Sequence, residues 1–129
     1  MNHETIVDNL ADELVSMTIE TARLEVSASQ FERRAKIFDD VADVFHDLLA
    51  KVECNQEAKT LHAQSIVQIR QQLQAAIKAE EENEQEANRL MHEASAIQKQ
   101  HDKYCQVLKA LRTLQHICTQ PPILCIAKY

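Results

Sequence analysis

The sequence predicts an all-α protein in which long helices with a heptad pattern form a coiled coil or a multi-chain helical bundle. The first observation behind this prediction is that apolar residues between 28 and 52 recur at alternating steps of three and four, on one helix face. The second is that the 129-residue chain contains no Gly, and its two Pro residues stand together at 121 and 122. Because Gly and Pro mark most turns, their absence before residue 121 argues against strands and hairpin turns.

The N-terminal residues are expected to form a helix in register with the later heptads. Asn2 or Thr5 is the expected cap of its first turn. A capping-box pattern at Ser29 and Glu32 would suit a new helix start, but the heptad runs through these residues without a skip. One continuous helix is therefore favoured over a break at Ser29.

The strongest heptad signal is an apolar row in which small and large residues alternate, which we call the Phe seam. Such alternation lets a ring fill the space beside a methyl group on a facing helix. The row is predicted to face partner helices inside a multi-chain bundle. The alternative is the core stripe of a helical hairpin closed within this chain. The seam consists of Ala28, Phe31, Ala35, Phe38, Ala42, Phe45, Leu49 and Val52.

The apolar arc around the Phe seam is wider than a two-stranded contact requires. Val41 and Leu48 add apolar side chains at heptad position g. Ile37 and Val44 add two more at position c. An arc of this width needs more than one neighbouring helix, which favours the partner-facing interpretation. Val41 and Leu48 are accordingly included among the predicted partner contacts.

Residues 53–65 are the weakest part of the pattern, because a continued seam would place Gln56 and Lys59 in core positions. The apolar repeat resumes at Ile66, but the spacing between its two apolar rows changes. The second row follows the first by four residues before this segment and by three residues after it. A phase shift in a continuous helix explains this change. A bend between two helices, with Asn55 as a cap, explains it equally well.

The C-terminal half contains a polar segment, 78–89, that places Glu80 and Asn83 in core positions and is expected to be a solvated helical shaft. Apolar spacing then returns, and residues 1–120 are predicted to form one coiled-coil or helical-bundle region. The two Pro residues end the helix, and the apolar tail, 121–129, is expected to pack on this chain or on a partner. Further partner contacts are predicted at Leu90, Ile97, Tyr104, Leu108 and Leu111.

Charge is distributed unevenly along the chain. Residues 1–58 hold five basic and thirteen acidic residues, whereas residues 94–129 hold five basic residues and one acid. Asp39, Asp43 and Asp47 follow one another at i,i+4 steps and are expected to form a solvated face, with a basic patch on a partner helix as the alternative. No basic patch interleaved with aromatic residues is present, which argues against nucleic acid as a partner.

Residues with metal-binding or catalytic chemistry lack supporting motifs. The four Cys residues have no paired spacing, so free thiols in a reducing compartment are expected, with no signal peptide and no membrane span. His101 and Cys105 share a helix face, but a zinc site would require them to converge with His116 and Cys118. We therefore expect no metal, no cofactor, no small-molecule substrate and no catalytic residue.

In general character the chain resembles the small coiled-coil subunits of spindle, kinetochore, ciliary-transport and vesicle-tethering complexes. This likeness covers most of the chain and implies a non-enzymatic subunit that holds partner helices in register. The expected partners are other coiled-coil proteins, with hetero-oligomers favoured over homo-oligomers. A microtubule-associated spindle or kinetochore complex is the narrower expectation, in the cytoplasm or nucleus. The alternatives are a trafficking or ciliary-transport subunit and a stand-alone homo-oligomeric scaffold.

Overall fold

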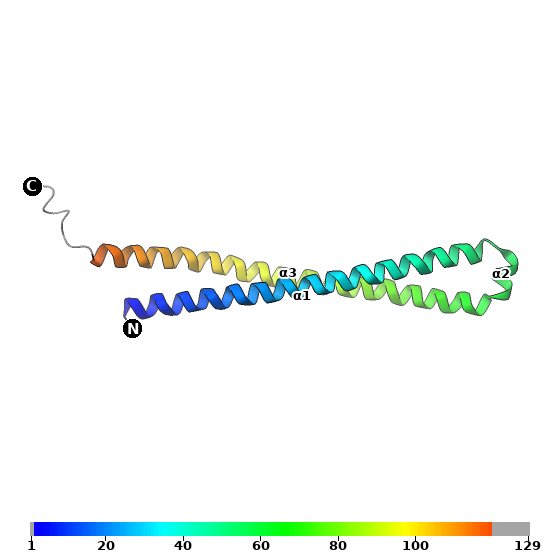
Figure 1. Ribbon diagram of the computed structural model, residues 1–129, viewed down its shortest axis with the longest axis horizontal. Coiled ribbons are helices and arrows are strands. Elements are labelled where there is room, and N and C mark those ends of the chain that lie inside the picture. The colour runs from blue at the N-terminus through cyan, green and yellow to red at the C-terminus, as the bar shows by residue number, and fades with distance from the viewer. Residues whose placement is uncertain (1, 120–129) are drawn as a thin grey trace, which may run out of the picture. The chain divides into compact units, whose positions relative to one another are not determined.

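The computed structural model describes residues 2–119, and three helices make up nearly all of this range. In chain order they are α1 (His3–Glu53), α2 (Gln56–Leu61) and α3 (Ala63–Thr119) (Figure 1). No strand occurs among the described residues, so the predicted all-α class is confirmed. The predicted apolar tail, 121–129, lies outside the described residues.

Helix α1 begins at a side-chain cap and runs without a break. The Asn2 Oδ1 atom accepts a hydrogen bond from the Thr5 backbone N–H at 2.7 Å, which satisfies one of the unpaired donors of the first turn. The helix passes through Ser29, so the predicted continuity at that position is confirmed. A Gly- and Pro-free sequence permits this length, because no residue in it removes a backbone donor or adds chain entropy.

The connection between the long helices is a corner built from Asn55, α2 and His62. Asn55 has extended backbone angles (φ −112°, ψ 115°), and its Oδ1 accepts from the Ala58 N–H at 3.1 Å to cap α2. His62 then leaves the helical region (φ −109°, ψ 23°) before α3 begins. The chain thus folds back without Gly or Pro. The expectation that scarce turn residues oppose a hairpin was wrong, because three residues outside the helices, Cys54, Asn55 and His62, are sufficient, with Asn55 as the cap of α2.

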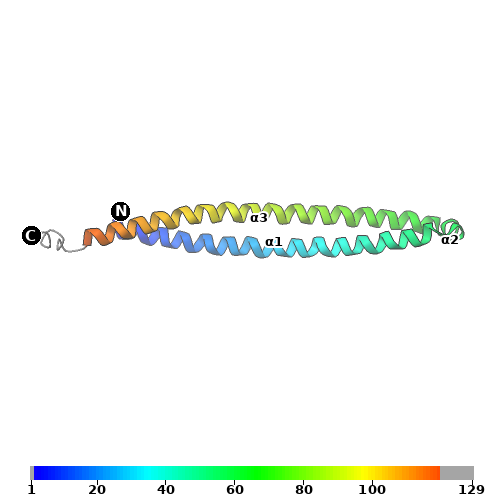
Figure 2. The same cartoon turned by 90° about the horizontal axis from the view of Figure 1, so that it is seen from above.

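The chain divides into two compact units, which are described separately. The turn unit comprises residues 24–92 and holds the corner. Within it, α1 and α3 run antiparallel and side by side (Figures 1 and 2). Its buried cluster takes side chains from both helices, with Phe45, Val52, Ile69 and Ile77 packed against it. The buried members are Ala42, Leu49, Ile66, Leu73 and Ala76.

The terminal unit comprises residues 2–23, which include the start of α1, and residues 93–119 of α3. Val7 and Leu14 pack there against Leu108, with Leu10, Tyr104, Cys105 and Leu111 around them. Polar contacts between the helices accompany this packing, and His3 Nε2 lies 2.9 Å from the Leu111 carbonyl oxygen. The two helices of this unit are therefore held together by apolar burial and by side-chain hydrogen bonding.

The polar segment, 78–89, is only partly solvated. Glu80 and Asn83 are half-buried, and Ala87 is buried. Asn83 satisfies its amide locally, since its Nδ2 donates to the Ala79 carbonyl oxygen at 2.6 Å. This corrects the expectation of a solvated shaft. The reason is that α1 lies against this segment in the turn unit, and Glu80 and Glu84 share a surface depression with Glu32, Ala35, Lys36 and Asp39.

Candidate partner-docking surface

Most residues predicted to face a partner helix are covered within the chain. Thirteen of the fifteen are buried or half-buried, and only Val41 and Leu48 are exposed. Ala42, Leu49 and Phe45 of the Phe seam contact α3 residues in the turn unit. Tyr104, Leu108 and Leu111 pack with α1 residues in the terminal unit. Phe31 and Phe38 are half-buried, and the Arg34 guanidinium carbon lies 5.0 Å from the centre of the Phe31 ring.

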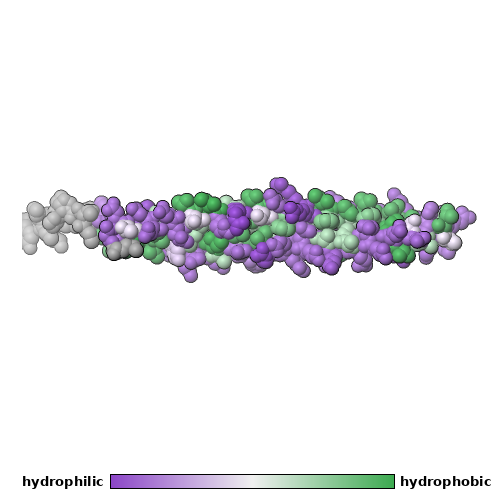
Figure 3. All heavy atoms as spheres, turned by 90° about the horizontal axis from the view of Figure 1, so that it is seen from below, coloured by the Kyte–Doolittle hydropathy of each residue, from purple (hydrophilic) through white to green (hydrophobic). Residues whose placement is uncertain are grey.

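A second apolar row on α1 stays exposed. Its four members are 37 % to 64 % exposed and follow one another at steps of four, three and four. This spacing puts them on one helix face, next to the Phe seam. Figure 3 shows apolar side chains reaching the surface among the polar ones. We call this row the α1 stripe; it consists of Ile37, Val41, Val44 and Leu48.

The α1 stripe lines a shallow depression of about 290 Å³. Ile37, Val41 and Val44 form its walls together with the half-buried ring of Phe45 and the carboxylate of Asp40. A depression lined by apolar side chains and one charged group offers burial to an apolar side chain from outside.

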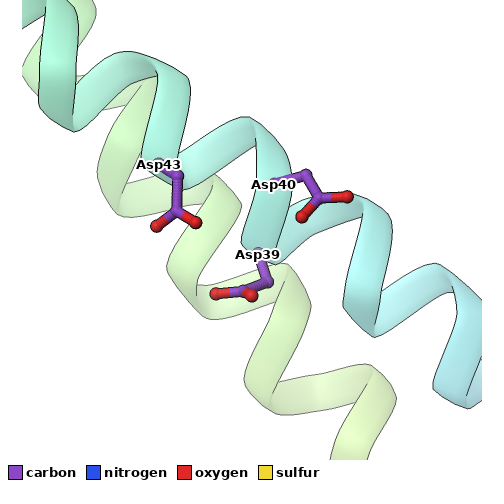
Figure 4. A group of neighbouring side chains, drawn as sticks. All are labelled: Asp39, Asp40 and Asp43. Carbon is purple, nitrogen blue, oxygen red and sulfur yellow. The ribbon is translucent and has the colours of Figure 1, made fainter.

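Carboxylates gather beside the α1 stripe. Oxygen atoms of Asp39, Asp40 and Asp43 lie within 4.8 Å of one another on α1 (Figure 4). The Lys36 Nζ atom lies 3.0 Å from Asp40 Oδ1 and 3.8 Å from Asp39 Oδ2. Asp43 and Asp47 make no ion pair among the described residues. The side chains are largely exposed, so the cluster is an acidic surface flanking the stripe.

Helix α3 adds a further acid to this region. The pKa of Glu80 is raised, first because its carboxylate is partly removed from water, and then because Asp39, Glu84 and Asp43 are nearby. Like charges from two helices therefore meet across this part of the turn unit. A cation or a basic side chain from another chain would relieve this repulsion.

A second exposed apolar row lies on α3 in the terminal unit. Its large members are 49 % to 61 % exposed, and its steps are three, four and three. Lys103 precedes the row by four residues and so lies on the same helix face. Neither Lys103 nor Lys109 makes an ion pair among the described residues. We call this row the α3 stripe; it consists of Val107, Ala110, Leu114 and Ile117.

The His and Cys residues considered for a zinc site have ordinary helical contacts. His101 Nδ1 lies 3.7 Å from the Cys105 Sγ atom, and His101 Nε2 lies 3.2 Å from Thr18 Oγ1. His116 is exposed, and the side chain of Cys118 lies outside the described residues. Within the described part, the one group of at least three potential metal-ligating side chains that lie close together is the Asp39 cluster.

Sequence reasoning found the α1 stripe as a widening of the apolar arc, but it did not separate the two faces by role. It also did not single out the α3 stripe as an exposed row of its own, and it missed the meeting of Glu80 with the acids of α1. The α3 stripe was detectable, because the steps from Val107 to Ile117 repeat those of a heptad row. The Glu80 contacts were not detectable, because they depend on which residues of the two helices lie opposite each other.

No described helix contains an apolar stretch that meets the requirements for crossing a membrane. Comparison of the chain with protein-family models, with curated proteins and with solved structures finds no match.

Proposed function

We propose that the protein is a non-enzymatic helical subunit of a multi-protein assembly, and that its α1 stripe binds a helix of another chain. The observation that carries this proposal is that four large apolar side chains remain exposed at heptad spacing on α1, although α3 already contacts the other face. Knobs-into-holes packing against a further helix is the arrangement that such spacing favours.

The continuity of the stripe supports this proposal more than its apolar character alone. Single exposed apolar residues are common on protein surfaces and carry no functional meaning. A row of four, spanning residues 37–48, presents about three turns of one helix face. Covering such a row removes apolar area from water along a line that only an elongated partner can match.

We propose other coiled-coil proteins as the partners, with a cytoplasmic or nuclear location. The narrower assignment to a microtubule-associated spindle or kinetochore complex stays a prediction from composition. Nucleic acid and small-molecule substrates are not proposed as partners, because the exposed surfaces in question combine apolar rows with acidic flanks.

The proposal is tested by comparing Val44→Ser with Val26→Ser in affinity purification followed by quantitative mass spectrometry. The two valines are matched, because both lie on α1 in the turn unit and are 64 % and 59 % exposed, but Val26 lies outside the stripe. Loss of the Val44 methyl groups removes about 1.5 kcal/mol of burial, which lowers affinity roughly tenfold. Recovery of partner chains should fall for Val44→Ser only. Equal recovery with both variants would contradict the proposal.

A further inference from the structure

We propose that the helix bound by the α1 stripe is the α3 stripe of a second copy of this chain, in antiparallel orientation. This inference rests on the proposed function and names the partner. The two stripes lie in different units of the chain, and each is exposed there. The chain therefore carries both halves of a contact between copies.

The spacing of the two rows matches when the helices run in opposite directions. Read backwards from Leu48, the α1 stripe has steps of four, three and four. Read forwards from Lys103, the α3 row has the same steps to Leu114. This alignment places Val44 opposite Val107 and puts the small Ala110 opposite Val41. Ile37 then faces Leu114, so three apolar pairs form in succession.

The charges beside the two rows are complementary in the same alignment. Lys103 falls opposite Leu48, next to Asp47, whereas Lys109 and Asp43 lie farther round their helices, on the same side of the contact. All four charged side chains are exposed and lack an ion pair among the described residues. Figure 4 shows Asp43 on α1 next to Asp39 and Asp40. Opposite charges that flank an apolar contact fix its register and speed its formation.

Contact between two copies of the same stripe is disfavoured by the same charges. Two α1 stripes would bring their aspartates together, and two α3 stripes would bring their lysines together. The favoured contact joins unlike surfaces, so an open row of copies keeps one unused α1 stripe at one end and one unused α3 stripe at the other until a ring closes. Four side chains cover much less than the roughly 800 Å² per partner of a standard interface. A single contact is therefore expected to be weak and concentration-dependent.

The test uses two charge-reversed variants of the full chain and their mixture. The first variant is Asp43→Lys with Asp47→Lys, and the second is Lys103→Glu with Lys109→Glu. Lys and Glu are good helix formers, so both variants should stay helical by circular dichroism. Sedimentation velocity over a range of concentrations measures self-association. The matched control is Asp8→Lys with Asp12→Lys, which makes the same charge change at exposed α1 positions away from the stripe.

The parent and the control should self-associate as concentration rises, more weakly at high salt. Each variant alone should associate at least about tenfold more weakly, because like charges then face each other. An equimolar mixture of the two variants should regain association, since its basic and acidic stripes are again complementary.

Two results would overturn the inference. One is a parent chain that stays monomeric throughout; in that case loss of partners with Val44→Ser would still support the proposed function with a different protein as partner. The other is self-association that the reversals leave unchanged, or that mixing the two variants fails to restore, because copies would then meet through other surfaces.

Discussion

At the scale of single residues, the pKa values of two half-buried carboxyls, Glu80 and Glu20, are shifted in opposite directions. Glu80 is half-buried near other acids, and its pKa is raised by loss of water first and by Asp39 next. Arg23 holds the pKa of Glu20 below its usual value, chiefly through a side-chain hydrogen bond. The placement of Glu80 therefore opposes the charged form that neutral pH favours.

Glu80→Gln is expected to make the free energy of unfolding less dependent on pH. A carboxyl whose pKa is higher in the folded chain binds its proton more tightly there, so stability falls as pH rises from about 4.5 through the raised pKa. The amide has no charge to acquire, and the variant should therefore gain stability relative to the parent over this window. Urea unfolding at about pH 4 and about pH 7, followed by circular dichroism, measures the difference.

The matched control for this measurement is Glu25→Gln, at an exposed position of the same unit. Its free energy of unfolding should depend on pH in the same way as that of the parent. Both chains keep the opposite contribution from Glu20, whose lowered pKa stabilises the folded chain at pH values above about 4.5. If Glu80→Gln also follows the parent, partial burial and the neighbouring acids do not destabilise the Glu80 carboxylate.

At the scale of helices, α1 has two apolar faces with different surroundings. The Phe seam is covered or half-covered, and its residues Ala42 and Leu49 contact α3. The α1 stripe is exposed. The heptad spacing alone indicates both rows, but it does not say which row packs within the chain and which faces a partner. That depends on whether the chain folds back.

Phe38→Ala is expected to destabilise the purified chain itself. Phe38 is half-buried, so its truncation should lower the free energy of unfolding by roughly 2–3 kcal/mol, below the 3–5 kcal/mol of a fully buried ring. The exposed control Arg33→Ala should change it by less than about 0.5 kcal/mol. Urea unfolding of the isolated chain measures both. Equal unfolding midpoints would show that the ring is not held by packing within the chain.

At the scale of the whole molecule, the sequence predicted the class of the fold and indicated the residues of the Phe seam and of the α1 stripe. Spacing and the absence of Gly are local properties, and they were sufficient to predict long helices. The sequence did not decide whether the chain folds back at Asn55, because a single Asn that caps a helix cannot be told by sequence from an Asn within one. The fold-back decides which apolar face of α1 is covered by α3 and which stays exposed. Sequence alone therefore did not separate the α1 stripe from the Phe seam.

The central claim is that the α1 stripe is free in the isolated chain and covered in the assembly. Val44→Cys places a thiol in the stripe, and Val26→Cys places one at a matched exposed position outside it. Exposed native Cys54 serves as an internal reference. Maleimide labelling, read by peptide mass spectrometry, is compared between the purified chain, diluted to limit self-association, and the assembly isolated from cells. The account predicts rapid labelling of Val44→Cys in the dilute chain and several-fold protection in the assembly, with Val26→Cys labelled equally in both. Equal labelling of Val44→Cys in the two samples would contradict it.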